Sequence, residues 1–550
     1  MTQASTIAKG SLWILSSTIA TKLISFIYTI IIARLLFAEE IGSFYLVLSV
    51  LGILYIFTDL GLMYSLARYV PYLYGRKEFG KLRNLVKLSY VGGGTLTFIF
   101  SVIVFGVSGH ISQFLGQPTI APILQIMSIW LLLREIDNVN RGILKGRKRM
   151  KETQGIGVIQ NFVKLAITII AFYIIGFNAE ALSVGFLLSF LLVLPLGGYC
   201  VIQEIKTWKK EETEYTLKEQ LSFSREIISF GLVVTLISTL WTIIQYTDRI
   251  MLSYFTEDAL ANIAIYTLAL GLANLVIIFP SGITGIFFPV VSELYGKKDF
   301  EGMNRMLKTS MKWLIMLMVP FTLIMGIFGD KLLELFYGGV YETGAIVLLL
   351  FVIGLFMRSI FSLPGLILSA MRRLDVELKA FGVAAIANVV LNLFFIPMWG
   401  INGAAFTSLI SLVILSTMIF YYSKRIFNFS FPKETYKPLV AGLVALVIIF
   451  LLKEPIISLV DSYVLEIQVG GSRGQLLDEL VQKMIKLVMF GLLFLLSVFI
   501  YFIALLALKS FGEEEISLLE AALRKARIPE NYISTIRNFL EAKWFKVPRT

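Results

Sequence analysis

Five cationic residues fall inside long apolar stretches, and they are the side chains best placed to do chemistry. They are Lys22, Arg134, Lys164, Arg249 and Arg358. A charge that faces lipid at bilayer depth costs about 2.5–3.5 kcal/mol on insertion scales. Lys22 and Lys164 have no acid in the middle turns of their own stretches, so they need an acid from another helix or a water-filled cavity. A cavity with excess positive charge suits an anionic ligand, because Arg binds phosphate oxygens in a bidentate manner and Lys attracts them as a point charge.

Acidic residues in the same stretches offer an alternative, in which the cations are paired for structural reasons. The candidate charge partners are Asp59, Asp137 and Asp248. Arg249 could pair with Asp248, and Arg134 with Asp137 or its neighbour Glu135. A polar stripe precedes Arg249 at helical spacing and would offer neutral hydrogen bonds of the kind that sugars use. It consists of Thr235, Ser238, Thr242 and Gln245.

The residues needed for catalysis or metal binding are scarce. Cys200 is the only cysteine and His110 the only histidine, so no His/Cys metal site and no Ser-His-Asp triad is expected. The Gly470–Gly474 run lacks the Lys-Ser/Thr of a phosphate-binding loop. We therefore expect no enzyme activity, no cofactor and no metal.

Helices that cross a membrane must position these cations. The chain is 57% hydrophobic and only 16% charged, whereas soluble domains carry about 25% charged residues. A spanning helix needs about 20 mostly apolar residues, and we count fourteen such segments. The sequence therefore predicts an all-α integral membrane protein.

An internal repeat organises these segments. Residues 74–89, YGRKEFGKLRNLVKLS, return 221 positions later as residues 295–310, YGKKDFEGMNRMLKTS. At an offset of 224, Arg358 falls on Arg134, and residues 400–402 on residues 176–178. Six spans in each half make this a parallel repeat about an axis normal to the bilayer. We expect a six-helix lobe at 1–203, a cytoplasmic linker at 204–224, a second lobe at 225–425, two extra spans at 426–508 and a cytoplasmic helical tail at 509–550.

Loop charges predict the orientation. Alternate loops are rich in Lys and Arg, and the loops between them are mostly acidic. Short basic loops stay in the cytoplasm, so an even number of spans leaves both termini there. The net charge of +12 is spread over separate loops, which suits anionic lipid rather than nucleic acid.

Two sites of helix irregularity are expected. Pro280 and Pro289 interrupt the eighth span, and residues 92–94, three glycines, loosen the third. Proline removes a backbone donor and can kink a helix. These positions would be either hinges of a conformational switch or features of static packing.

Several motifs in order resemble a known family. The first half has residues 33–36 (ARLL), 59–62 (DLGL) and 68–71 (RYVP). The second has residues 247–249 (TDR), Tyr266, and Asn388 and Asn392 before residues 396–397 (IP). Over residues 5–425 the chain resembles polysaccharide transporters, the Wzx-like oligosaccharide flippases of the multidrug/oligosaccharidyl-lipid/polysaccharide exporter superfamily.

The resemblance implies a fold and a function. It implies two six-helix lobes in a V around a central cavity, plus two C-terminal helices, with alternating access. The substrate would be an oligosaccharide linked through phosphate or diphosphate to a polyprenyl carrier, moved to the outer leaflet of the cell membrane for polysaccharide assembly, and other assembly proteins would be partners beside membrane lipids. The five mid-span cations would hold the phosphates. The alternatives are a cation-coupled multidrug exporter of the same superfamily, which would favour acids in the cavity, and a membrane glycan polymerase or ligase, which would need a larger outer domain.

Overall fold

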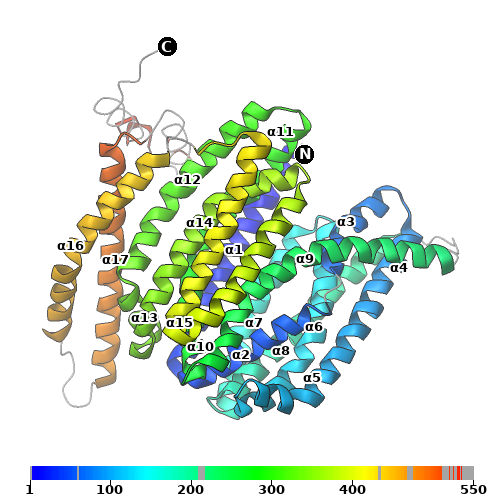
Figure 1. The fold of residues 1–550 in the computed structure, drawn as a ribbon, viewed down its shortest axis with the longest axis horizontal. Helices are drawn as coiled ribbons and strands as arrows, with labels where there is room; N and C mark the ends of the chain where they lie inside the picture. Colours follow the sequence, from blue (N-terminus) through cyan, green and yellow to red (C-terminus); the bar gives the residue numbers. More distant parts are fainter. Residues whose placement is uncertain are drawn as a thin grey trace.

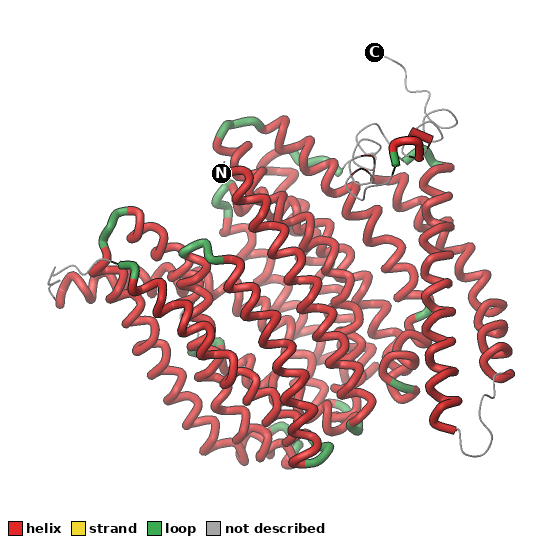
Figure 2. Tube along the Cα trace, turned by 180° about the vertical axis from the view of Figure 1, so that it is seen from behind, coloured by secondary structure: helices red, strands yellow, loops and turns green. Residues whose placement is uncertain are grey.

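The computed structural model is helical throughout the residues that it describes (Figures 1 and 2). These are residues 3–58, 61–208, 217–431, 435–466 and 475–510, with residues 520, 524, 529–532 and 534–535 of the tail. Asp59, the Gly470–Gly474 run and most of the tail lie outside them, as do residues 209–216 of the predicted linker.

The first half consists of eight α-helices with a π-helical and a 3-10 turn. They are α1 (Gln3–Leu35), α2 (Ala38–Tyr55), α3 (Leu62–Gly75), α4 (Phe79–Leu88), the π turn η1 (Ser89–Gly93), α5 (Gly94–Phe114), the 3-10 turn η2 (Pro118–Ile120), α6 (Ala121–Gly146), α7 (Met150–Ile175) and α8 (Ala179–Lys206). The predicted glycine irregularity of the third span coincides with η1, a π turn of the kind that often marks functional sites.

The second half follows the same order and ends in two additional helices. Its elements are α9 (Leu217–Phe255), α10 (Ala259–Ala273), the 3-10 turn η3 (Asn274–Ile277), α11 (Ile278–Gly296), α12 (Phe300–Ile327), α13 (Gly329–Tyr337), the 3-10 turn η4 (Gly339–Gly344), α14 (Ala345–Ala370), α15 (Leu374–Phe427), α16 (Tyr436–Glu466) and α17 (Gln475–Ala507). The 3-10 turn η3 lies just before Pro280, which has no N–H to bond to the carbonyl of Val276.

The fourteen predicted spans agree with the structure when α15 is counted as two spans and α9 is included. Twelve helices in the described ranges are long and apolar enough to cross a membrane. One of them, α15, breaks at Gly400 (φ 55°, ψ −129°). Its arms fold back so closely that a Cβ at Gly403 would lie 1.9 Å from the carbonyl oxygen of Phe395, so α15 is a hairpin of two spans. The 39-residue helix α9 is the fourteenth. The all-α membrane fold is confirmed.

The internal repeat is visible in the backbone of the turns. Lys77 and Lys298, 221 residues apart, have φ of 61° and 59°. Lys148 and Arg372, 224 residues apart, have φ of 58° and 60°. A basic residue with a left-handed backbone conformation therefore follows corresponding helices in both halves. We call the side of the molecule that carries these four turns the basic face, and the other side the opposite face.

The two halves meet along α2, which packs against α9 and α10. Near the opposite face a Cβ at Gly42 would lie 1.8 Å from the carbonyl oxygen of Leu260, so only glycine permits this approach. There too, the Arg34 side chain of α1 donates hydrogen bonds to the carbonyl oxygens of Glu334, Leu335 and Phe336, at 3.0, 2.6 and 3.1 Å. The carbonyls belong to the last turn of α13, where cations are favoured; that of Glu334 also accepts the backbone N–H of Gly338 at 2.9 Å.

The two C-terminal helices stand at the edge of the second half. Figure 1 shows α16 and α17 beside α12, away from α3 to α8. Lys453 of α16 lies 3.4 Å from Asp330 of α13. The elements that position the candidate site are α1, α9, α10, η3, α14 and α15, not the appended pair.

Candidate functional site

A cavity of about 360 Å³ lies between α1 and the second half. Its volume is within the range of small-molecule sites, about 300–1,000 Å³. Lys22 of α1, Arg249 of α9 and Arg358 of α14 line it, so the structure brings together three of the five predicted cations. Its other polar lining residues include Trp241, Gln245, Asp248, Asn274 and Ser408.

None of these three cations forms an ion pair within the described part of the chain. The guanidinium carbon of Arg358 lies 3.7 Å from the ring centroid of Trp241. Arg249 lies between the rings of Tyr45 and Tyr246, at 5.9 and 5.7 Å, and donates a hydrogen bond to the Ser49 hydroxyl at 3.3 Å. Aromatic faces stabilise cations without neutralising them, so the cavity holds three cations and one acid, Asp248, that forms no ion pair with them.

The other two predicted cations lie elsewhere in the first half. The guanidinium of Arg134 lies 4.3 Å from the Tyr55 ring centroid and 4.8 Å from that of Trp130. The Lys164 ammonium lies 4.3 Å from the ring centroid of Tyr28 on α1. Neither residue lines the cavity of Lys22. Of the predicted neutral stripe, only Gln245 does.

Asp248 is a predicted charge partner, yet it binds neutral groups rather than the adjacent Arg249. It is 2% exposed. Its carboxylate accepts hydrogen bonds from the Tyr266 hydroxyl, from the Asn392 amide at 2.7 Å and from the Ser408 hydroxyl at 2.5 Å. Thr407 donates to the side-chain oxygen of Asn392, whose amide also donates to Asn388 at 3.3 Å. We call Asp248, Tyr266, Asn388, Asn392, Thr407 and Ser408 the Asp248 cluster.

The Asp248 cluster offers oxygen atoms without a second charge. A single carboxylate with amide and hydroxyl oxygens suits a proton or a small hard cation better than a transition metal. Among the described residues, no three His, Cys, Asp or Glu side chains gather as they would around a metal ion. The second predicted partner, Asp137, does pair, with Arg141 at 2.6 Å. The third, Asp59, lies outside the described residues.

Sequence reasoning missed a similar acid in the first half. Glu135 of α6 is 2% exposed. It accepts a hydrogen bond from the Tyr55 hydroxyl, which in turn accepts one from the Asn138 amide at 2.6 Å. Glu135 also lies beside η1, because a Cβ at Gly93 would be 2.8 Å from its Oε1. The sequence signal was available, since Glu135 follows Arg134 in a span, but it was interpreted only as a partner of that arginine.

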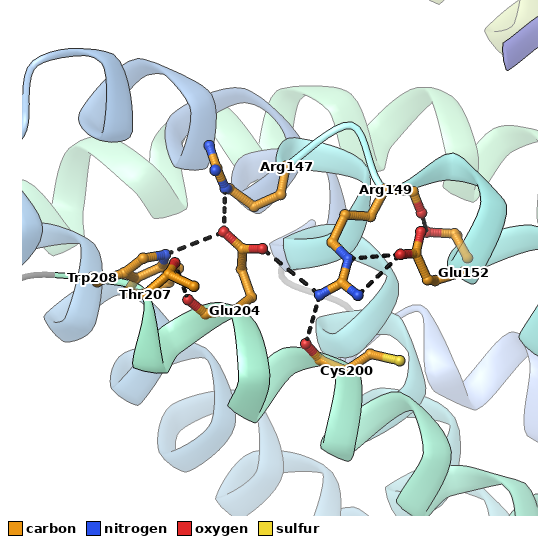
Figure 3. A network of polar contacts seen from close by, with 8 residues as sticks. Arg147, Arg149, Glu152, Cys200, Glu204, Thr207 and Trp208 are labelled. Carbon is orange, nitrogen blue, oxygen red and sulfur yellow. Dashed lines mark hydrogen bonds and ion pairs between the residues drawn. The ribbon is translucent and has the colours of Figure 1, made fainter. Parts of the chain in front are cut away.

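On the basic face, by contrast, arginines are paired with acids (Figure 3). Glu204 of α8 accepts a hydrogen bond from Arg147 at 2.5 Å and lies 3.7 Å from Arg149. Arg149 also pairs with Glu152 at 2.9 Å and donates to the carbonyl oxygen of Cys200 at 3.1 Å. The indole of Trp208 donates to Glu204 at 3.4 Å. We call these residues the Glu204 cluster; it joins the α6–α7 turn to the end of α8.

Known proteins resemble the chain over most of its length. The family model described as "Polysaccharide biosynthesis protein" matches residues 7–295, and the MatE model matches residues 234–394. An uncharacterized membrane protein of Methanocaldococcus jannaschii is 24% identical over 84% of this chain and 92% of its own length. "Probable low-salt glycan biosynthesis flippase Agl15" of Haloferax volcanii is 21% identical over 72% of this chain and 79% of its own length.

Solved structures agree with the fold. An inward closed conformation of the lipid II flippase MurJ superposes with a TM-score of 0.64, at 14% identity, over 87% of this chain and 98% of that one. At this identity the likeness establishes the fold alone. The polysaccharide family model matches more than half of the chain, and the chain therefore belongs to the polysaccharide biosynthesis protein family.

Proposed function

We propose that the protein is a flippase that moves a lipid-linked oligosaccharide, joined to a polyprenyl chain through phosphate or diphosphate, from the inner to the outer leaflet of the cell membrane. The observation that carries the proposal is the cavity lined by Lys22, Arg249 and Arg358, which form no ion pair with a described acid and outnumber Asp248, the one acid that lines it. The relative Agl15, by its name a probable flippase of glycan biosynthesis, supports it. The activity is transport, for which no catalytic residue is required.

The chemistry of such a substrate matches the cavity. The glycan is too polar to cross hydrocarbon, whereas the polyprenyl tail can remain in lipid. The protein must therefore supply a polar path for the head. Arg249 and Arg358 would bind phosphate oxygens bidentately and Lys22 would add a point charge, while Gln245 and Asn274 offer neutral hydrogen bonds to sugar hydroxyls.

We propose that the two halves rock about the cavity, as alternating access requires. The lobes at residues 1–203 and 225–425 would be the moving bodies. The Arg34 bonds to α13 and the contact of Gly42 with Leu260 would have to break when the opposite face opens.

We further propose that the basic face is cytoplasmic, with both termini on that side. Single cysteines at Glu212 and Glu257 in a Cys200→Ala background should then label from opposite sides of the membrane. Labelling from one side would refute this orientation.

The Asp248 cluster is our candidate for coupling to an ion gradient. Its single buried carboxylate lines the same cavity as the three cations, so a proton or monovalent cation there would change the field on the anionic head. Asp248→Asn should abolish any dependence of flipping on a proton or sodium gradient. An unchanged dependence would exclude Asp248.

The direct test is flipping of a lipid-linked oligosaccharide by the purified protein in liposomes. Arg358→Gln should reduce the rate by about 10- to 100-fold, the value of one charge-assisted contact. Lys331→Ala is the matched control, since Lys331 bonds instead to Glu334 at 3.0 Å, a hydrogen bond that raises the pKa of the Lys331 ammonium. No flipping by the wild-type protein would contradict the proposal.

A multidrug exporter is the second candidate, because the MatE model matches residues 234–394. Three uncompensated cations in the cavity argue against cationic drugs, which they would repel. Extrusion of cationic dyes by cells that express the protein separates the two: the flippase proposal expects none, and robust extrusion would favour the exporter.

A further inference from the structure

The pair of Arg358 and Trp241 carries an inference about how the cavity binds anions. Arg358 of α14 lies in the apolar part of the second half, yet among the described residues no acid pairs with it. Instead, its guanidinium carbon is 3.7 Å from the Trp241 ring centroid, and both residues line the cavity. Trp241 is in turn supported by Phe381, edge-on at 6.2 Å and 81°.

The geometry of this contact determines which groups of Arg358 remain free to bind an anion. The guanidinium is planar, and its five N–H donors point outward in that plane. An aromatic face attracts the cation without accepting any of these hydrogen bonds in the way that a carboxylate would. A carboxylate would also neutralise the charge, and an incoming anion would have to displace it. An indole partner lowers the cost of burying Arg358 and leaves both its charge and its donors available.

We propose that Trp241 is a positioning residue, which holds Arg358 in place for the phosphate or diphosphate group of the substrate. The inference rests on the proposed function and adds to it the residue that keeps the arginine available. Trp241 acts through Arg358 and need not touch the phosphate.

The repeat supplies an independent comparison. Arg134 occupies the position in α6 that corresponds to Arg358 in α14, and it too lies on aromatic rings, those of Tyr55 and Trp130. These rings come from α2 and α6, whereas Trp241 comes from α9. The aromatic contact is thus shared by both halves although different helices supply it, which separates it from chance packing of one tryptophan.

The test is a double-mutant cycle on binding of polyprenyl diphosphate, without sugar, to the full-length protein in nanodiscs. Trp241→Leu should weaken binding by about 5- to 30-fold, and Trp241→Phe should retain most of the affinity because a ring face remains. In an Arg358→Gln background, Trp241→Leu should have little further effect. Trp399→Leu is the control and should leave binding unchanged, because Trp399 packs on Phe395 and Phe406 and does not line the cavity. Trp241→Met, with its longer and more adaptable side chain, replaces the leucine variant if that one does not fold.

The outcomes separate the inference from the proposed function. Additive losses from the two substitutions, or equal losses from the phenylalanine and leucine variants, would overturn the positioning role while leaving the flippase proposal intact. Wild-type protein that does not bind polyprenyl diphosphate would overturn both. The role would be established by two results together. Trp241→Leu weakens binding in the wild-type background but has no effect in the Arg358→Gln background, and Trp241→Phe binds nearly as well as the wild type.

Discussion

The cavity and the Glu204 cluster both contain arginines, but these have different partners: aromatic rings at the cavity and carboxylates in the Glu204 cluster. On the basic face Arg147 and Arg149 share the carboxylate of Glu204 (Figure 3). At the cavity Arg358 lies on Trp241, and Asp248, the acid that lines the same cavity, binds hydroxyls and an amide. The first arrangement satisfies every charge internally, whereas the second leaves both signs available. The Glu204 cluster joins helices through ion pairs, and the difference supports our proposal that the cations of the cavity bind an anion from outside the chain.

The largest expected effect comes from removing the cavity charge altogether. Replacing Lys22, Arg249 and Arg358 together by glutamine should reduce flipping at least about 100-fold, because each charge-assisted contact is worth about 1.5–3 kcal/mol. The thermal midpoint should not fall, since uncompensated buried charges disfavour folding. Loss of folding in this variant would make the cavity resemble the Glu204 cluster and would break the comparison.

Glu204→Gln should do the reverse. It leaves Arg147 and Arg149 without their shared carboxylate, and we expect a loss of about 2–3 kcal/mol of stability. That is below the about 3–5 kcal/mol of a fully buried pair, because about a fifth of each arginine side chain is exposed. Thermal unfolding in detergent measures the loss. Flipping per folded molecule should stay at the wild-type level, and a specific transport defect would show that the cluster does more than join helices.

Arg134→Gln sharpens the comparison, because Arg134 has aromatic partners, forms no ion pair with any residue that the structure describes, and does not line the cavity. If only cations that line the cavity bind the substrate, Arg134→Gln should lower the flipping rate by less than about 10-fold, which is below the effect of losing one contact to the substrate. Lys164→Gln tests the same point with a different cation. A loss as large as that of Arg358→Gln would return Arg134 to the binding set expected from the sequence.

Pro280→Ala should have the smallest effect. The substitution restores a donor beside η3, the 3-10 turn that supplies Asn274 to the cavity. We expect a change in the balance between accessibility of the two faces, with folding preserved. Double electron–electron resonance distances between spin labels on the two halves measure it. Distances identical to those of the wild type would mean that Pro280 shapes packing only.

The sequence predicted the scaffold well because the scaffold depends on local patterns. Apolar length identifies spans, and the repeat at offsets of 221 and 224 identifies turns that share their backbone conformation, such as Lys77 with Lys298. The offset of 224 also aligns Arg134 with Arg358. The irregularities at η1 and η3 also followed from glycine and proline, whereas Pro289, the second expected interruption of the eighth span, lies inside the continuous helix α11.

Partners across helices could not be predicted in this way. The spacing of residues does not predict the contact of Trp241 with Arg358. The two residues are 117 positions apart, and the fold of the intervening chain brings them together. A pair of Asp248 with Arg249 was one alternative, yet adjacent residues on a helix point in different directions, and packing gave Asp248 other donors. The signal that existed lay in the motif residues Tyr266, Asn388 and Asn392, which carry the family resemblance and converge on Asp248.

The four left-handed turns of the basic face bear on how the protein is made. Lys77, Lys148, Lys298 and Arg372 each hold a conformation that costs a side-chain-bearing residue about 1 kcal/mol and costs glycine almost nothing. A glycine would fold more easily there but would remove a positive charge from a short loop. During synthesis such charges retain a loop on the cytoplasmic side. With the basic face in the cytoplasm, as we propose, the strained residues would act as insertion signals, repeated so that the second half enters the bilayer in the same direction as the first.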